Sequence, residues 1–307
     1  MKIITMIGLA LILLACAEPD NTDTAQEVAE DGLAETEIHL GGCILLTPIG
    51  EVPDDLYAIG DVVPAQSIAP FTKELQVYGL RLAARDDASD DFMRLVAQTI
   101  AEVFPQRDDL DMEKQREVLA NHYRYNVLIP VPVGDDFSFM EENAEQWELL
   151  ESQNTVCDII MQDVPARQVM EVVEHILHFV TDVGLHYTYP DEWGISATST
   201  VAEAMRISVE NGYYDISGYT DINDEEIRFR VELQEFAYWF ISTAWDLQEP
   251  YGPAEEEEWT IKDSKELKEK LPGLYEAYER TVARVMVAPS SSTLMEIGPT
   301  WAEEKAK

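Results

Sequence analysis

The distribution of apolar residues along the chain is the feature that most limits how it can fold. Residues 3–14 are apolar except for Thr5 and Gly8, and Lys2 gives this run a positive start. After residue 16, no apolar run approaches the roughly 20 residues that a transmembrane helix needs. The rest of the chain must therefore bury its apolar side chains within a folded body. A charged start followed by a short apolar core is typical of a secretory signal.

The end of this run carries a more specific motif. Leu13-Leu14-Ala15-Cys16 resembles the lipobox of bacterial lipoproteins. The resemblance implies that residues 1–15 are a cleaved signal peptide and that Cys16 is diacylated on its sulfur and acylated on its new amino group. Each buried methylene contributes about 0.8 kcal/mol, so two or three acyl chains anchor a protein firmly. The implied partner is a membrane of the cell envelope, and Ala17 favours the outer membrane. An ordinary signal peptide or a loose anchor is the alternative.

Composition divides the rest of the chain into three regions. Residues 16–37 combine the lipidated cysteine with an acidic tether that has no aromatic residue. Such a segment buries too little apolar surface to offset the entropy of ordering, so we expect it to be disordered. An α+β N-terminal region follows over residues 38–134, and a helix-rich region covers residues 135–307. The turn at Gly134-Asp135-Asp136 is the expected boundary between them.

Hydrophobic periodicity predicts an α+β fold with a small sheet in the N-terminal half and a helix-rich C-terminal half. The expected strands are residues 38–47, 74–83, 126–133 and 155–161. The expected helices are residues 89–104, 112–123, 166–183, 198–210, 263–270 and 274–286. Pro130 and Pro132 place their strand at a sheet edge, and Gly184 should stop the third helix. Residues 223–247 fit a strand and a helix, with their length favouring the helix, and the tail from residue 288 reads as a loop.

The charge of the chain excludes some partners. Its 60 acidic side chains against 21 basic ones give a net charge of −39. Such a surface repels nucleic acid and anionic lipid headgroups and attracts cations. Self-repulsion of this size is tolerable where salt screens it, since the Debye length falls from about 10 Å at 0.1 M to about 3 Å at 1 M. The acidity is therefore either a binding property or an adaptation to the solvent.

Two cysteines remain once Cys16 is assigned to lipid. Cys43 and Cys157 form an even pair in an exported protein, which permits one disulfide. Each also lies in an apolar, strand-like run. Two buried free thiols therefore fit the sequence equally well.

The strongest chemical signal is a concentration of histidines. Three of the five in the chain lie within residues 175–186. Two imidazoles and three carboxylates share one face of the expected helix 166–183, in a sector about 100° wide: Glu171, Glu174, His175, His178 and Asp182. Imidazole and carboxylate suit zinc and other first-row divalent metals. This pattern predicts a divalent-metal site with a further ligand from elsewhere. The alternative is the solvated face of an amphipathic helix in a very acidic protein.

The order of elements around these histidines is similar to that of the zincin metallopeptidases. A strand precedes the histidine helix, and an acidic helix follows with Glu235, 57 residues after His178. The resemblance implies that Glu174 polarises water and that His175, His178 and Glu235 hold zinc. Glu171, which stands where the inverted motif His-x-x-Glu-His begins, is a further candidate ligand. The chain lacks His-Glu-x-x-His, so the similarity also fits a scaffold that has lost catalysis.

Two function classes follow. The first is a lipid-anchored, zinc-dependent hydrolase that acts on peptides or proteins. The second is a non-catalytic surface lipoprotein that binds a partner or cations through its acidic surface. They differ in geometry, since an enzyme should bring Glu174 and His175 within a few ångströms of Glu235 in a concave site. A binding module would leave this helix face flat and solvated.

Overall fold

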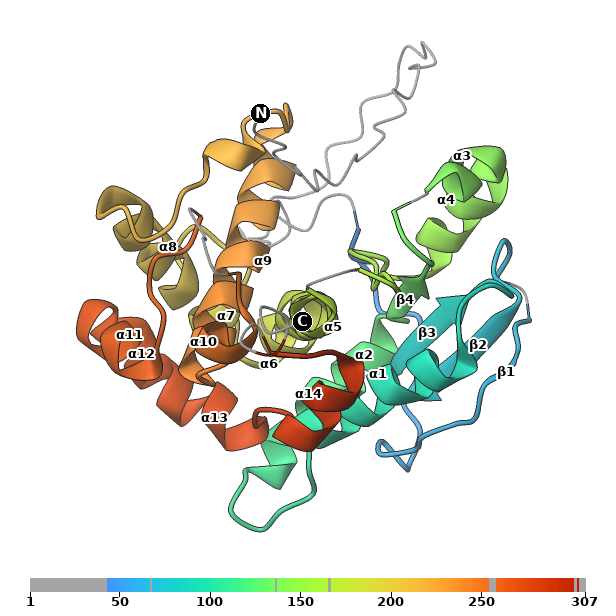
Figure 1. Cartoon of the computed structure of the whole chain (residues 1–307), viewed down its shortest axis with the longest axis horizontal. Coiled ribbons are helices and arrows are strands. Elements are labelled where there is room, and N and C mark those ends of the chain that lie inside the picture. Colours follow the sequence, from blue (N-terminus) through green and yellow to red (C-terminus); the bar gives the residue numbers. More distant parts are fainter. Residues whose placement is uncertain are drawn as a thin grey trace, which may run out of the picture. The chain divides into compact units, whose positions relative to one another are not determined.

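The computed structural model describes residues 43–66, 68–135, 137–164, 167–253, 258–300 and 303. The predicted signal peptide, Cys16 and the acidic tether lie outside these residues. The described residues belong to one unit, with a small sheet in its N-terminal half and helices dominating its C-terminal half (Figure 1). The predicted α+β class is confirmed. Among the described residues, no helix combines the length and apolar character that crossing a membrane requires.

Four strands form the sheet, and they are β1 (Val63–Pro64), β2 (Lys73–Val77), β3 (Leu80–Ala84) and β4 (Leu128–Val131). The first three are antiparallel neighbours, and β4 is parallel to β3. The single strand predicted over residues 74–83 is wrong. Tyr78 and Gly79 turn the chain back between β2 and β3, with φ angles of 50° and 85°. Two successive residues with positive φ are what a tight two-residue hairpin requires.

β4 lies at the edge of the sheet, as its prolines predicted. The segment expected as a strand over residues 155–161 runs beside it, held by parallel bridges near both ends. Between these bridges, the carbonyl of Pro130 accepts a hydrogen bond from the Ile160 N–H at 2.9 Å. The prolines have no N–H to donate in return, so no regular ladder forms. The expected strand is therefore irregular, and this irregular backbone carries Asp158.

The first described residues are held by a disulfide. Cys43 and Cys157 are bonded, so of the two alternatives left by the sequence the disulfide is present. The carbonyl of Cys43 also accepts a hydrogen bond from the Val156 N–H at 3.1 Å. The strand expected over residues 38–47 is wrong for residues 43–47, where no ladder partner lies alongside and Leu46 is 69% exposed.

The helix predicted over residues 263–270 is present as α11 (Ser264–Lys270), and the one predicted over residues 274–286 is divided at Thr281 into α12 (Pro272–Arg280) and α13 (Val282–Val285). Three further predicted helices are present close to their expected bounds: α1 (Asp90–Val103), α2 (Met112–Arg124) and α8 (Thr200–Glu210). Each begins after a side chain that accepts a hydrogen bond from a backbone N–H of the first turn. These N-caps are Ser89, Asp111 and Ser199. Such caps satisfy N–H groups that have no partner within the helix, which is why polar residues mark these helix starts in the sequence.

The histidine helix does not stop at Gly184 as predicted. α5 (Gln168–Phe179) continues into a π-helical segment, η1 (Val180–Leu185), and then into α6 (His186–Thr188). Gly184 lies where this helix passes α2, and a Cβ there would come within 2.7 Å of Nε2 of His122. The glycine therefore permits a close approach between two helices, and it does not end one.

The ambiguous segment before residue 247 is a helix, α9 (Glu225–Ala244), whose N-cap Asp224 accepts hydrogen bonds from two backbone N–H groups. The other described helices are α3 (Ser138–Glu142), α4 (Ala144–Gln153), α7 (Pro190–Trp193), η2 (Ser217–Tyr219), α10 (Gln248–Tyr251) and α14 (Ser291–Ile297). The loop expected from residue 288 is wrong, because Ser290 caps α14 and Leu294 anchors it in the core.

The apolar core positions α5 between the sheet half and α9. Val172, Ile176 and Val180 are fully or almost fully buried in a cluster that also contains Leu82 of β3 and Phe240 of α9. Burying one such side chain contributes roughly 1.5–3 kcal/mol. α5 also contacts α9. The polar side of α5 therefore includes His178 beside Glu235 of α9.

Candidate metal-binding site

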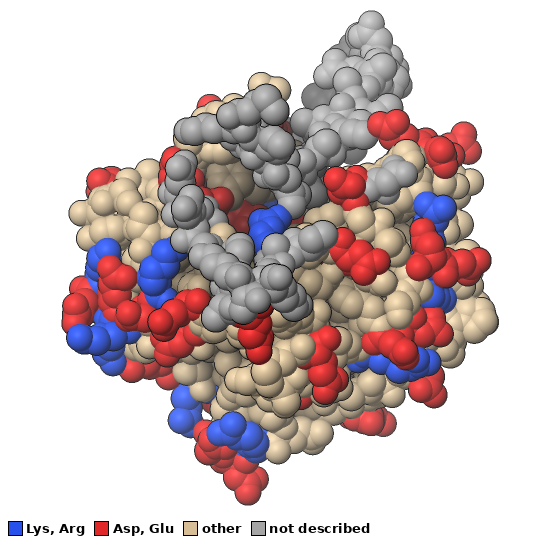
Figure 2. Space-filling view, viewed as in Figure 1, with Lys and Arg blue, Asp and Glu red and all other residues tan. Residues whose placement is uncertain are grey.

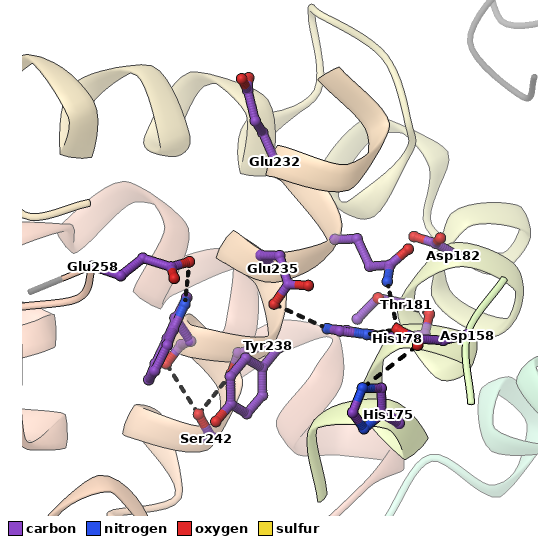
Figure 3. Close-up of polar contacts among 12 residues, drawn as sticks. Asp158, His175, His178, Thr181, Asp182, Glu232, Glu235, Tyr238, Ser242 and Glu258 are labelled. Atoms are coloured by element: carbon purple, nitrogen blue, oxygen red, sulfur yellow. Dashed lines mark hydrogen bonds and ion pairs between the residues drawn. The ribbon is translucent and has the colours of Figure 1, made fainter. Parts of the chain in front are cut away.

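Three segments meet at the polar face of α5. Figure 3 shows His175 and His178 of α5, Asp158 of the irregular segment and Glu235 of α9 pointing toward one another. This face is not solvated, because most of its side chains are buried. Glu174 and Glu235 keep partial exposure, and the side chain of Glu235 is 18% exposed. The carboxylates therefore lie on the solvent side of the histidines.

His178 is the centre of the site. Its side chain is 0% exposed, and its Nδ1 lies 2.6 Å from Oδ2 of Asp158. An ionised carboxylate only accepts hydrogen bonds, so Nδ1 carries the proton that it shares with Asp158. Nε2 of the same ring is buried without a hydrogen-bond partner and lies 3.4 Å from Oε2 of Glu235. Burial alone would lower the pKa of His178, but the carboxylates of Glu235 and Asp158 outweigh it and raise this pKa well above its usual value. A metal that binds at Nε2 would therefore displace a proton from the nitrogen that faces Glu235.

Glu174 completes a group around this nitrogen. One ligand atom each from Glu174, His178 and Glu235 lie within 4.8 Å of one another. Burial, and after it the nearby carboxylate of Glu235, together raise the pKa of Glu174 to about 8. Two carboxylates that face each other in this way disfavour their own ionisation, and a bound cation would remove that cost.

His175 belongs to a different group. Its Nδ1 lies 2.6 Å from the carbonyl oxygen of Glu171, and its Nε2 lies 3.5 Å from Oδ1 of Asp158. Burial alone would lower the pKa of His175, but the carboxylates of Asp158 and Glu171 outweigh it and raise the pKa to about 9. Asp158, His175 and His178 form a second set of ligand atoms within 4.8 Å of one another. The structure therefore turns His175 toward Asp158.

Glu171 has a structural contact of its own. Its Oε1 accepts a hydrogen bond from the Met161 N–H at 2.8 Å and lies 3.3 Å from Nδ1 of His175. This bond ties the end of the irregular segment to the first turn of α5. Of the four candidate ligands, His178 and Glu235 thus share a group with Glu174, whereas His175 and Glu171 lie on the side of Asp158.

Behind Asp158 lies a row of buried polar side chains that the sequence pattern did not indicate. Nε2 of Gln234 donates to Oδ2 of Asp158 at 3.2 Å, and NH1 of Arg230 donates to Oε1 of Gln234 at 2.5 Å. The same NH1 donates to Oδ2 of Asp182 at 3.0 Å. Asp158 could have been suspected, because it is the only acid in the apolar run Val156–Met161. Nothing in the local pattern pointed to Gln234 or Arg230.

A third set of potential ligand atoms, Cys43, Cys157 and Asp182, is also close together. Its cysteines are bonded to each other, so they offer no thiolate to a metal. The described residues thus contain two buried groups of His, Asp and Glu side chains that could hold a metal ion.

The surroundings of Glu235 are acidic and aromatic. Oε1 of Glu258 accepts hydrogen bonds from the Tyr219 hydroxyl at 2.5 Å and from Nε1 of Trp239 at 3.0 Å. Figure 3 shows Glu232, one turn before Glu235 on α9, pointing away from His178. Glu232 therefore offers a carboxylate on the same helix that takes no part in the group around His178.

A cleft of about 320 Å³ opens at the start of α5. Its lining includes Asp163, Arg167 and Tyr251, and it does not include Glu174 or Glu235. The cleft and the group around His178 are therefore distinct features of α5.

No protein-family model, no curated protein and no solved structure matches this chain.

Proposed function

We propose that this protein is a lipid-anchored metalloprotein of the cell envelope, in which Glu174, His178 and Glu235 bind a divalent transition metal, with zinc as the first choice. The observation that carries the proposal is the Nε2 atom of His178. It is fully buried, lacks a hydrogen-bond partner and faces two carboxylates. Histidines that bind metals usually donate their other ring N–H to a carboxylate, and His178 has Asp158 in that position.

The donor set favours a reactive site over a structural one. Catalytic zinc sites use three protein ligands and leave a position for water, whereas structural sites are closed by four. Zinc bound here would lower the pKa of that water to about 7 and so make it a nucleophile at neutral pH. The partial exposure of Glu174 and Glu235 supports access from solvent. Peptide hydrolysis is the reaction that we propose, consistent with the zincin-like order of elements.

Glu174 has a different role in this proposal from the one that the zincin resemblance implies. We assign it as the third ligand in place of His175, because its carboxylate lies within 4.8 Å of the ligand atoms of His178 and Glu235. A Glu174→Gln variant separates the two roles. Loss of zinc would identify a ligand, whereas retained zinc with lost peptidase activity would identify the base that polarises water.

The metal site is tested by the metal content of the full-length protein, purified in detergent without added metal and analysed by elemental mass spectrometry. We expect about one zinc per chain in the parent and little in His178→Ala or Glu235→Gln. Glu232→Gln is the matched control, because it removes the same charge from the same helix. No metal in the parent, and no rise in melting temperature on adding zinc, would overturn the proposal.

The proposed lipid anchor rests on the motif Leu13–Cys16 and is tested separately. Mass spectrometry of the mature N-terminus should find Cys16 as the first residue, carrying the added mass of three acyl chains. A Cys16→Ser variant should lose membrane association and retain its metal content. An unmodified N-terminus in the parent would contradict the anchor without affecting the metal site.

One observation favours a second candidate, a non-catalytic lipoprotein that binds cations over its surface. Acidic side chains are spread across the visible face and outnumber the basic ones (Figure 2). This candidate predicts several weak sites for calcium or magnesium that Glu235→Gln leaves unchanged, and no hydrolysis of peptides by the zinc-loaded protein.

A further inference from the structure

We infer that Arg230 and Gln234 are positioning residues that act through Asp158 to hold the proton on Nδ1 of His178 and so direct its Nε2 lone pair at the metal. The inference rests on the proposed metal site and extends it to two residues whose side chains lie behind Asp158. It follows from which groups in this buried row can donate hydrogen bonds and which can only accept them.

The guanidinium of Arg230 sets the first orientation. Arginine has N–H donors and no acceptor, so Gln234 must present its amide oxygen, and these atoms lie 2.5 Å apart. The NH₂ group of Gln234 then faces Oδ2 of Asp158 at 3.2 Å. With the amide flipped, two donors would face each other across the contact with Arg230. The side chain of Arg230 is 2% exposed, so water does not offer an easy substitute.

Asp158 links the amide of Gln234 to the ring of His178. Oδ2 accepts from Gln234 and lies 2.6 Å from Nδ1 of His178, while Oδ1 accepts from the Ile159 N–H at 2.8 Å. Hydrogen bonds donated to a carboxyl group favour its charged form, and here the donors are the amide of Gln234 and the Ile159 N–H. A carboxylate can only accept, so in the neutral ring the proton stays on Nδ1 and the lone pair stays on Nε2.

Asp182 pairs with the buried positive charge of Arg230. Its Oδ2 lies 3.0 Å from NH1 of Arg230, and both side chains are almost fully buried. Removing one member of a buried ion pair is strongly destabilising, because it leaves the other charge without compensation. Gln234 is therefore the better position for a test, since it can be changed without breaking the pair between Arg230 and Asp182.

The test uses Gln234→Glu, which keeps the shape of the side chain and the bond to Arg230 but replaces the donor that faces Asp158 with an acceptor. We expect zinc affinity, measured by competition with a chelator, to fall about tenfold or more, as is usual for residues behind a metal ligand. In ¹⁵N-histidine NMR spectra, the Nδ1–H signal of His178 should lose its protection from exchange with water. Arg230→Lys should cause a smaller loss, because the charge beside Asp182 remains.

Arg228→Lys is the matched control, because Arg228 lies on the same helix and contacts Glu232 instead of Gln234. It should match the parent in zinc affinity and in the ring signal. Parent-like affinity and an unchanged signal in Gln234→Glu would overturn the inference, and so would a lower melting temperature with an unchanged signal. The Nδ1–H signal of His178 is also recorded without zinc. If the parent fails to bind zinc, the proposed metal site is overturned, and the signals of the metal-free parent and variant still test whether Gln234 positions the ring.

Discussion

Asp158 and His178 lie 20 positions apart in the sequence, and their side chains meet at 2.6 Å between Oδ2 and Nδ1. This contact joins the irregular segment beside β4 to the second half of α5. It also divides the site in two, with His175 and Glu171 on one side and Glu174 and Glu235 on the other.

Replacing Asp158 with asparagine should weaken zinc binding by about 10- to 100-fold, the range typical of residues that orient a metal ligand. An amide can present either a donor or an acceptor to Nδ1, so the ring no longer has a fixed lone pair on Nε2. Isothermal titration with zinc measures the change. Asp163→Asn, an exposed position of the same segment, should bind zinc as the parent does, and equal affinity for both variants would contradict the role of Asp158.

The buried histidines away from the site should make the protein sensitive to acid. Burial lowers the pKa of His122 and that of His186 to about 4. The unfolded chain takes up protons near pH 6.5 while the folded protein does not, so stability should fall progressively as the pH drops from about 6.5 to 4. For the fully buried His122, a difference of this size corresponds to about 3 kcal/mol.

His122→Asn isolates this contribution. The substitution lowers stability by a constant amount through lost packing, but it should also flatten the dependence of the urea unfolding free energy on pH between 4 and 6.5. In the metal-free protein, His175 and His178 act mainly above this window, because carboxylates raise their pKa values, to about 9 for His175. Their contribution to stability is lost as the pH rises above about 6.5. The quantity to compare is therefore the slope of the unfolding free energy against pH between 4 and 6.5, in the variant and in the parent. Parallel curves would contradict the lowered pKa of His122.

Gly184→Ala should destabilise the protein by about 1–3 kcal/mol, the usual cost of overfilling a packed interior. Its Cβ would lie 2.7 Å from Nε2 of His122 and 2.8 Å from Cγ1 of Val118, between the π-helical segment and α2. Gly218→Ala is the control, since nothing lies within 4 Å of the added carbon there. Both are compared by urea unfolding, and similar stabilities would mean that the helices separate at little cost.

Loss of the disulfide between Cys43 and Cys157 should lower stability by about 2–4 kcal/mol, because it closes a long loop of the unfolded chain. The double variant Cys43→Ser/Cys157→Ser and the reduced parent should unfold at similar urea concentrations. Since Asp158 follows Cys157 directly, zinc affinity is measured on the same samples. Unfolding that does not respond to a reductant would contradict a stabilising role.

Local sequence patterns predicted the parts of this protein that depend on neighbours along the chain. Spacing of three and four residues marked α1, α2 and α8, and it placed Glu174 and His178 on one face of α5, because side chains one turn apart share a side of a helix. The zincin-like order of elements, and no local pattern, implied Glu235 as a partner, and Glu235 lies on the later helix α9. Prolines placed β4 at the edge of the sheet because they lack the N–H that an interior strand needs.

Packing between distant segments settled the rest. Gly184 has the sequence appearance of a helix stop, yet its small size serves a contact with His122, which lies 62 positions earlier. His175 and His178 are equivalent in the local pattern, and only tertiary packing distinguishes them. His175 meets Asp158 with its Nε2, whereas His178 meets it with Nδ1 and turns its Nε2 toward Glu235. Gln234 and Arg230 acquire their roles because burial removes water as a competing partner, so their side chains bond to Asp158 and Asp182 of other segments.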